Sequence, residues 1–583
     1  MKNLIIALAL LLPQSAPAAA VKNPNMLVYA QIGDTDSFDP AWSYDTASHN
    51  IIANVYETLI FYSGSELSEK GLMPMLATKV PSLANGLISK DGLSYRFPIR
   101  KGVKFHDGSE LTPEDARYSM LRFMLFDRDG GPSSLLLEPL LGVNSTRDNG
   151  KIRPGIHDQA AKAVTVQGQD LVFRLKKPYA PFLGILANFG SIVSKPWCAS
   201  HEQWDGRPET WEKFNNPLRE SSYLNEHTNG TGPYQLERLD RRNKEIVLAR
   251  FPGYWRGAAK IEKVVIKTID EFATRKLMLQ AGDADVIYGP QMYFNQLQNI
   301  PGVELMDGLQ NLERSSILFF TYKINPVANP YLGSGKLDGE GITPEFFSDI
   351  NIRKAFAYSV DYEGYIRDML RGKGRQASSF IPPGLVGYRK DGKKYTLDLK
   401  KAEEHFKKAW GGQVWDKGFK FTMVFNSGSA PAQSICQMIK KNVESINPKF
   451  KIDIRSLQWS TFLEQSQAGK MAFFLGAWQA DFPDAHNFAF PLLHSQGYFP
   501  SKQKYSNPKV DALIERAVST LDLKKREALY QQLQDMVYED VPHVHMAEGM
   551  RYRSQRSWVK GFVFRPIFPD SPYGSYYYDL RKE

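Results

Sequence analysis

Hydrophobic positions recur along the chain with two different periods. Short apolar runs at residues 26–31, 315–322 and 471–476 are bounded by polar or turn-forming residues, a pattern typical of buried strands. Residues 349–361 instead carry their apolar side chains at helical spacing, at Ile352, Ala355, Phe356 and Val360. The chain is therefore predicted to mix strands and helices.

The order of these elements predicts two lobes. Residues 261–287 show a strand, a helix and a second strand in succession, which is a β-α-β unit. The strand at 315–322 is expected to cross into a second α/β lobe. The aromatic tail at 559–579 is expected to return to the first lobe and help to close its sheet.

Size and composition support a globular chain of several domains. With 583 residues it exceeds the size at which a single core divides, and 42% hydrophobic and 12% aromatic residues argue against disorder. The two cysteines, Cys198 and Cys436, are too few to hold such a chain together. We expect them to be unpaired because they fall in different predicted lobes.

The first residues predict export. Lys2 is followed by nine apolar residues from Leu4 to Leu12 and then by small residues up to Ala20, the pattern of a cleavable leader. No cysteine near this point offers a lipidation site, and no later apolar run approaches membrane-spanning length. We therefore expect a free, exported protein.

The formal charge of +10 does not by itself indicate a partner. Lysines and arginines are scattered in short clusters such as 241–244, without a long basic stripe or a nucleic-acid-binding motif. A basic, solvated surface is the expected result, and no nucleic acid is expected as a partner.

Residues 476–488 contain the main candidate for ligand chemistry. The strand at 471–476 ends near Trp478 and Asp481, and Pro483 and Asp484 then favour a turn. A carboxylate beside an indole and Phe482 is costly to desolvate unless a cation meets it. Either a lysine or arginine of the chain supplies that cation permanently, or a ligand ammonium supplies it on binding.

Several segments resemble a known family in the order of its motifs. They are Ser37-Phe-Asp-Pro40, Tyr56-Glu57-Thr-Leu59, Lys101-Gly-Val-Lys-Phe-His-Asp-Gly108, Asn229-Gly-Thr-Gly-Pro-Tyr234 and Asp349-Ile-Asn-Ile-Arg353. This series resembles the family 5 extracellular solute-binding proteins, the peptide- and nickel-binding group of ABC importers. The resemblance covers nearly all of the chain after the leader.

The resemblance implies a type II periplasmic-binding-protein fold, an α/β architecture of two lobes around a ligand cleft with an extra domain in the first lobe. The expected divisions are a leader at 1–20, a first lobe at 21–60, 190–311 and 546–583, an extra domain at 61–189, and a second lobe at 312–545.

The resemblance also implies a function. Asp481 matches the position at which relatives pair with the α-amino group of a bound peptide, and Trp478, Phe482 and Phe488 are expected to wall the pockets. The implied protein is a monomer that captures short peptides and delivers them to a membrane permease. A nickel chelate, an opine or a sugar remains open as the solute, because Phe473, Phe474 and Leu475 replace the basic residue that oligopeptide-binding members often carry ahead of the tryptophan.

Catalysis, metals and cofactors are not expected. The chain lacks Gly-x-Ser-x-Gly, His-Glu-x-x-His and Cys-x-x-Cys-His, so an exported hydrolase is the less favoured alternative. His106 and Asp107 fall in a segment that is a structural turn in the resembling family. His543 and His545 point to one side of a predicted strand, but no third metal ligand accompanies them.

Overall fold

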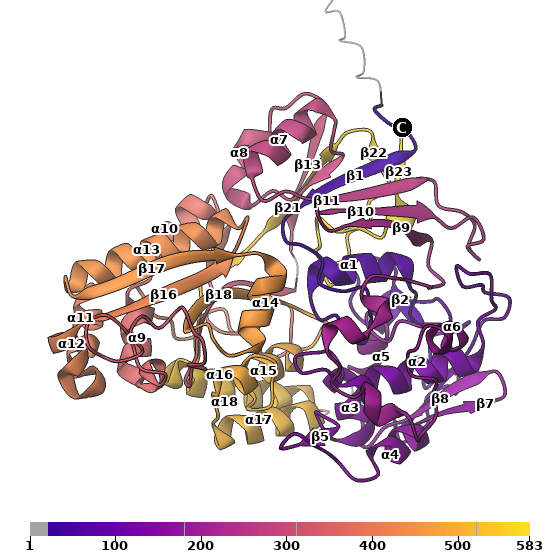
Figure 1. Cartoon of the computed structure of the whole chain (residues 1–583), viewed down its shortest axis with the longest axis horizontal. Coiled ribbons are helices and arrows are strands. Elements are labelled where there is room, and N and C mark those ends of the chain that lie inside the picture. The colour runs from indigo at the N-terminus through magenta and orange to yellow at the C-terminus, as the bar shows by residue number, and fades with distance from the viewer. Residues whose placement is uncertain (1–20, 180, 311, 521) are drawn as a thin grey trace, which may run out of the picture.

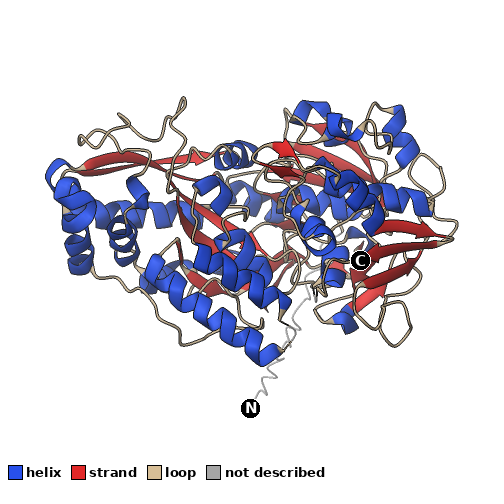
Figure 2. Ribbon diagram, turned by 90° about the horizontal axis from the view of Figure 1, so that it is seen from below, coloured by secondary structure: helices blue, strands red, loops and turns tan. Residues whose placement is uncertain are grey.

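Two β-sheets, each accompanied by helices, organise the molecule (Figure 1). The computed structural model describes residues 21–179, 181–310, 312–520 and 522–583, so the predicted leader lies outside the described residues. Helices and strands alternate in both halves of the molecule (Figure 2), which confirms the α/β prediction. Within the described ranges, no helix is both long and apolar enough to cross a membrane.

The first sheet has seven strands and contains the amino-terminal strand at its centre. Its order is β13 (Val303–Leu309), β21 (Arg551–Arg556), β12 (Val286–Ile287), β1 (Met26–Gln31), β11 (Lys263–Thr268), β10 (Glu245–Arg250) and β9 (Tyr234–Asp240). β1 pairs in parallel with β11 and β12, and the outer pairs are antiparallel. Apolar side chains on both faces of β1 are buried, as expected for a central parallel strand.

The second sheet has five strands and lies beside the first. Its order is β17 (Phe450–Leu457), β16 (Phe419–Asn426), β18 (Phe473–Gln479), β14 (Glu313–Phe320) and β19 (His543–His545). Helix α13 (Ala430–Ile446) packs against β16 and β17, with Ile435, Cys436, Ile439 and Val443 buried. The apolar spacing of this helix therefore faces the sheet.

A smaller three-stranded sheet forms a third unit, drawn in purple at the lower right of Figure 1. It contains β4 (Ser94–Pro98), β8 (Asp170–Arg174) and β7 (Val164–Gln167). Helix α2 (Pro113–Phe126) packs against β7 and β8, and Thr112 and Asp115 form a reciprocal capping box at its start. This capping box and Pro113 in the first turn fix where the helix begins.

Other helices complete the layers around the three sheets. They are α1 (Thr46–Val55), α3 (Ser134–Leu141), α4 (Ile156–Ala163), α7 (Phe272–Ala281), α9 (Ile350–Tyr358), α11 (Leu399–Lys408), α14 (Trp459–Gln467), α15 (His486–Leu493), α17 (Pro508–Ser519) and α18 (Leu523–Asp540). Both cysteines are unpaired and buried, which confirms that prediction.

The chain passes between the two large sheets where β13 is followed by β14, and it returns from β19 to β21 through the short strand β20 (Ala547–Gly549). The returning strand is Arg551–Arg556, just ahead of the aromatic tail that was expected to close the sheet. The tail itself packs on α1, where the Asn50 side chain donates to the Tyr577 hydroxyl at 3.2 Å. β21 is therefore the strand that joins the first sheet, and the aromatic tail that follows it packs against α1.

His106 has both ring nitrogens engaged by one loop. The backbone N–H of Gly230 donates to Nδ1 at 3.2 Å, and Nε2 lies 3.0 Å from the carbonyl oxygen of Gly232. One nitrogen accepts while the other donates, so the ring is neutral in this arrangement. Burial lowers the pKa of His106 to about 4.

We expect His106 to make the protein less stable in acid. Its folded-state pKa of about 4 lies below the ordinary value of about 6.5. Its contribution is therefore fully present above pH 6.5 and is lost as the pH falls toward 4. The free energy of unfolding of the wild type should drop by about 2 kcal/mol more than that of His106→Gln between pH 7 and pH 4.5. Urea titrations at both pH values test this, and parallel pH curves would contradict it.

Candidate functional site

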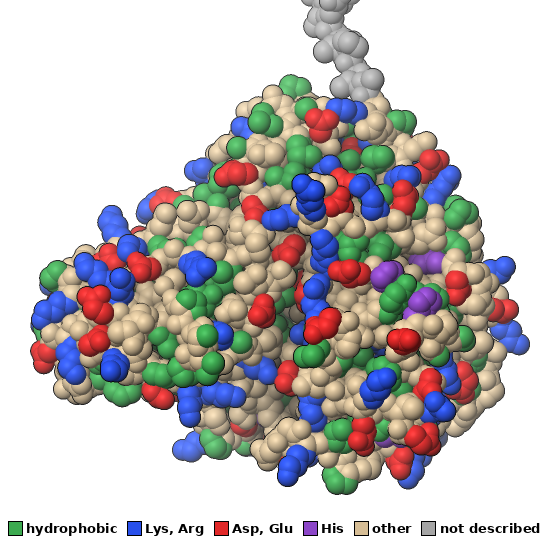
Figure 3. Space-filling model, viewed as in Figure 1, with side chains coloured by type: hydrophobic (Ala, Val, Ile, Leu, Met, Phe, Trp, Pro, Cys, Tyr) green, Lys and Arg blue, Asp and Glu red, His purple; other side chains and the backbone are tan. Residues whose placement is uncertain are grey.

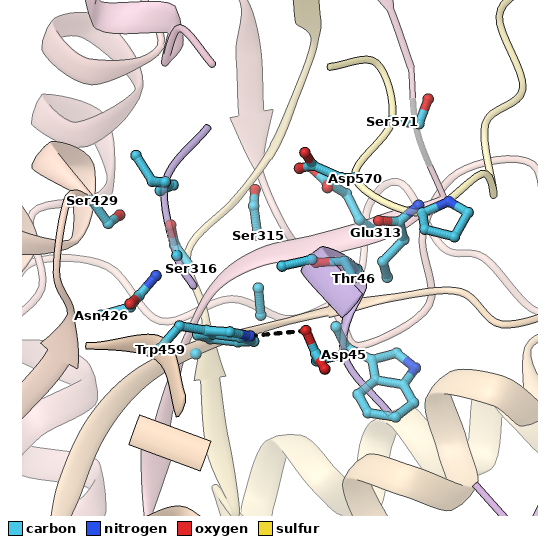
Figure 4. Close-up of a pocket in the computed structure, with 18 of the residues that line it drawn as sticks. Asp45, Thr46, Glu313, Ser315, Ser316, Asn426, Ser429, Trp459, Asp570 and Ser571 are labelled. Atoms are coloured by element: carbon cyan, nitrogen blue, oxygen red, sulfur yellow. Dashed lines mark hydrogen bonds between the residues drawn. The ribbon is translucent and has the colours of Figure 1, made fainter. Parts of the chain in front are cut away.

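A cavity of about 340 Å³ lies between the two large sheets. The end of β18 contributes Trp478, and the loop that follows contributes Asp481. β14 contributes Ser315 and Ser316, and the segment ahead of α1 contributes Asp45. Figure 4 labels Ser315 and Ser316 of β14 and Asp45 ahead of α1 among the side chains that line the pocket.

Asp481 is held by donors from both sides of the cavity. The Tyr44 hydroxyl and the Asn487 side-chain amide each donate to Oδ2 of Asp481 at 2.7 Å. The Asn487 side chain also accepts from the backbone N–H of Asp481 at 2.7 Å, and the Asn188 side chain donates to its backbone carbonyl at 3.2 Å. These contacts fix the carboxylate at the wall of the cavity.

No lysine, arginine or histidine within the described ranges forms an ion pair with Asp481. The residue is 7% exposed. Burial raises the pKa of Asp481 to about 7, although the hydrogen bonds from Asn487 and Tyr44 lower it. The carboxylate is thus desolvated without a neutralising charge, so an incoming cation would be strongly favoured there. Of the two alternatives that the sequence left open, the internal ion pair is not formed among the described residues.

Aromatic rings surround this carboxylate. Tyr44 meets Trp478, Tyr498 and Phe189 edge to face, with ring centroids 5.6, 5.4 and 5.9 Å apart. The Trp478 indole N–H donates to Oδ1 of Asn487 at 3.3 Å, which orients the ring. Edge-to-face packing and this hydrogen bond give the cavity a rigid aromatic wall.

The four predicted site residues are not all brought together. Asp481 and Trp478 line the cavity. Phe482 lines a second cavity of about 530 Å³ on the other side of Tyr44 and Tyr498. Phe488 is fully buried on α15. The predicted roles of Phe482 and Phe488 as ligand walls stay predictions.

A bulge in β14 supplies polar groups that the sequence reasoning missed. The pairing of β14 with β18 shifts register between Arg314 and Ile317, which leaves Ser315 and Ser316 in the bulge. Ser316 adopts a positive φ of 61°, an uncommon conformation for a residue with a side chain. Bulges of this kind often lie beside functional sites. The apolar run predicted at 315–322 gave no sign that its first residues face a cavity.

A second acidic region lies elsewhere in the same lining. Glu313 on β14 accepts from Arg551 on β21 at 2.5 Å. Asp570 accepts a hydrogen bond from the Tyr29 hydroxyl, and burial raises the pKa of Asp570 to about 6. Figure 4 places Asp570 and Glu313 near each other on one side of the pocket. Neither carboxylate was singled out from the sequence.

Hydrogen bonds between the two halves hold the cavity closed. The Trp459 indole at the start of α14 donates to Oδ1 of Asp45 at 3.1 Å, the dashed line in Figure 4. The Ser460 hydroxyl donates to Asp34 at 2.7 Å. The Gln458 side chain donates to Asp270 at 2.9 Å. These contacts join α14, which accompanies the second sheet, to loops of the first.

The histidine pair on β19 does not form part of a metal site among the described residues. His543 and His545 lie with their ring centroids 4.6 Å apart. Nowhere in the described ranges do three or more histidine, cysteine, aspartate or glutamate side chains gather in a way that would hold a metal ion.

Figure 3 shows acidic and basic side chains interspersed over the visible face, without a continuous basic stripe.

Two sheets with their helices on either side of a cavity, and a third unit beside them, give the two-lobed architecture of a solute-binding protein. The sequence matches the family described as bacterial extracellular solute-binding proteins, family 5, over residues 71–500. The chain belongs to this family.

Similar proteins support the same fold along the whole chain. The chain is 26% identical to the "Dipeptide-binding protein" of Escherichia coli, covering 97% of each. It is 25% identical to the "Probable D,D-dipeptide-binding periplasmic protein DdpA" of the same organism, covering 96% of each. The structure of DppA from Helicobacter pylori in complex with the peptide STSA matches with a TM-score of 0.73 and 25% identity, over 96% of this chain and 98% of that one. The fold is therefore the type II periplasmic-binding-protein architecture that was expected.

Proposed function

We propose that this protein is the periplasmic peptide-binding component of an ABC importer. It captures a short peptide in the cavity between its lobes and delivers it to a membrane permease. The observation that carries the proposal is the Asp481 carboxylate, which is buried, held by Tyr44 and Asn487, and without an ion-pair partner in the described ranges. A peptide's α-ammonium would supply the missing cation, and its N–H groups can donate hydrogen bonds to the carboxylate.

The closed arrangement supports capture by hinge motion. Only the connections from β13 to β14 and from β19 to β21 join the two large sheets in the described chain order. Separation of the lobes about these segments would break contacts such as Trp459 to Asp45 and open the cavity. Peptide relatives and the peptide-bound neighbour from Helicobacter pylori make a peptide the favoured solute.

The finer details belong to the same proposal. The protein is exported through the leader at 1–20, is released without a lipid anchor, and acts as a monomer that binds its ligand without chemical change. The lobes divide at the boundaries expected from the sequence, with the first lobe interrupted by the extra domain at 61–189. Trp478 forms the wall next to the ligand's amino end.

Native mass spectrometry of gently purified periplasmic protein tests this function. We expect adducts whose masses fit intact short peptides. A peptide that binds should raise the free energy of unfolding by about 2.7 kcal/mol at 100 times its Kd, which a thermal-shift panel of peptides would detect. Recovery of a single non-peptide mass, or cleavage of the added peptides, would overturn the proposal.

A further inference from the structure

The charges around the main cavity are unequal. Among the described residues that line it there are four carboxylates, those of Asp45, Glu313, Asp481 and Asp570, and a single arginine, Arg551. No lysine of the described ranges is part of the lining. Arg551 is already paired with Glu313, so three carboxylates face the cavity without an ion-pair partner among the described residues.

The one histidine of the described lining does not correct this imbalance. His49 lines the cavity, and its Nε2 lies 2.8 Å from the carbonyl oxygen of Asn188. Burial lowers the pKa of His49 to about 4, so the ring is neutral at neutral pH. A ligand with a free carboxylate would therefore find no unpaired cation in the described lining.

The acidic groups form two separate regions. Asp481 receives its side-chain hydrogen bonds from Tyr44 and Asn487, whereas Asp570 receives one from Tyr29. Glu313 and Arg551 influence the pKa of Asp570, but neither is among the groups that shift the pKa of Asp481. The two carboxylates therefore share no hydrogen-bond donor among the described residues.

Gln291 provides an independent sign of a ligand group in the second region. It lines the cavity from the short helix Gln291–Tyr293 and is 7% exposed. Neither its Oε1 nor its Nε2 has a hydrogen-bonding partner in the structure. A buried amide with both groups unsatisfied is costly, and a polar ligand group that reaches it would remove this cost. The segment that leads into Gln291 contacts the chain beside Asp570: Tyr288 packs against Tyr573 with ring centroids 4.6 Å apart, and the backbone N–H of Tyr573 donates to the carbonyl oxygen of Asp570 at 2.9 Å.

We infer that the ligand carries at least two positive charges, one met by Asp481 and the other by the second region around Asp570 and Gln291. This inference rests on the proposed peptide-binding function and specifies its substrate class. The ligand is a peptide whose second positive charge is a lysine- or arginine-type side chain. The second ammonium or guanidinium donates to the Asp570 carboxylate and to Oε1 of Gln291.

The test uses three peptides of equal length that share a free amino end. One residue of an alanine peptide is replaced by lysine, by norleucine or by glutamate, and the Kd of each is measured by calorimetry at pH 7.5. We expect the lysine peptide to bind at least tenfold tighter than the norleucine peptide and the glutamate peptide to bind weakest. Amidation of the carboxylate end should strengthen binding of all three.

Asp570→Asn locates the effect. It should reduce the preference for lysine over norleucine, measured as the ratio of their Kd values, from at least tenfold to about twofold. Asp158→Asn, an exposed carboxylate on α4 outside the cavity lining, is the matched control and should keep the full preference. Gln291→Leu serves as a second variant if Asp570→Asn unfolds.

The possible outcomes distinguish a failure of this inference from a failure of the proposed peptide-binding function. Equal or tighter binding of the norleucine or glutamate peptide to the wild type would overturn the inference and leave peptide binding intact. A wild type that binds none of the peptides, in any amidated or free form, would overturn both.

Discussion

Replacing Asp481 by alanine is expected to nearly abolish the binding of peptides with a free amino end. The peptide ammonium would lose the carboxylate that meets it, in a cavity wall where Asp481 is 7% exposed. Removing one partner of a buried charge pair costs about 3–5 kcal/mol, which corresponds to a loss of roughly 150-fold or more in affinity. Calorimetric titration of the same peptide into wild type and variant measures this loss.

Two controls separate the charge from the packing around it. Asp481→Asn keeps the size of the side chain and should lose nearly as much affinity as alanine. An N-acetylated peptide lacks the ammonium and should bind weakly to wild type and variant alike. If Asp481→Ala retained wild-type affinity for free-amine peptides, Asp481 would not be the ammonium anchor.

The same carboxylate gives binding a characteristic pH dependence. The pKa of Asp481 in the free protein is about 7, so a proton competes with the ammonium at lower pH. Affinity should fall nearly tenfold per pH unit below that value. It should also fall above about pH 8, where a peptide's α-amino group loses its proton. Asp481→Asn should remove the acid limb of this profile, and an acid limb that persists in the variant would have to come from another group.

Much of the sheet architecture was predictable because buried strands appear in the sequence as short apolar runs. β1 begins and ends where its apolar run predicted. β18 was expected at 471–476 but spans Phe473–Gln479, because its pairing with β14 and β16 decides where the ladder starts. Asp481 could be identified as a candidate ligand-binding residue because it follows an apolar strand and the Trp478 indole within a few residues.

The rest of the cavity was not predictable from local pattern. Asp570 and Gln291 come from segments far apart in the sequence and become neighbours of the cavity only when the lobes assemble. The bulge at Ser316 depends on pairing between strands, which no apolar period encodes. Polar cavity residues of this kind look like ordinary loop or strand residues until the partner elements are placed.

The segments that carried the family resemblance prove to be connected to one another. Glu57 accepts from the hydroxyls of Thr231 and Tyr254 at 2.8 Å and from the Trp255 indole at 3.1 Å. His106 contacts the glycine loop that contains Thr231. These residues lie in different motifs but form one hydrogen-bonding network, away from the cavity. Their physical role is to join the first lobe to the unit inserted in it.

Asp39, within Ser37-Phe-Asp-Pro40, makes the strongest of these connections. Arg122 on α2 donates to both of its carboxylate oxygens at 2.6 Å, and the Ser222 hydroxyl and the backbone N–H of Ala41 donate as well. Asp39 is fully buried and Arg122 is 2% exposed. Burial alone would raise the pKa of Asp39, but the Arg122 guanidinium and these hydrogen bonds hold it below its ordinary value.

Arg122→Met is therefore expected to destabilise the protein by about 3–5 kcal/mol at pH 7, because it leaves a buried carboxylate without its counter-charge. Urea unfolding of wild type and variant measures the loss. The double variant Asp39→Asn/Arg122→Met removes both charges and should recover a large part of it, since a neutral buried pair avoids the desolvation cost.

Peptide affinity separates this structural role from a role in the binding site. Neither Asp39 nor Arg122 lines the cavity, so the folded Arg122→Met protein should bind peptides with a Kd within about twofold of the wild type. A destabilisation below about 1 kcal/mol would mean that water or a rearranged side chain replaces the guanidinium. A large loss of affinity at full folding would instead mean that this pair sets the position of Tyr44, five residues further along the chain, and through it the orientation of Asp481.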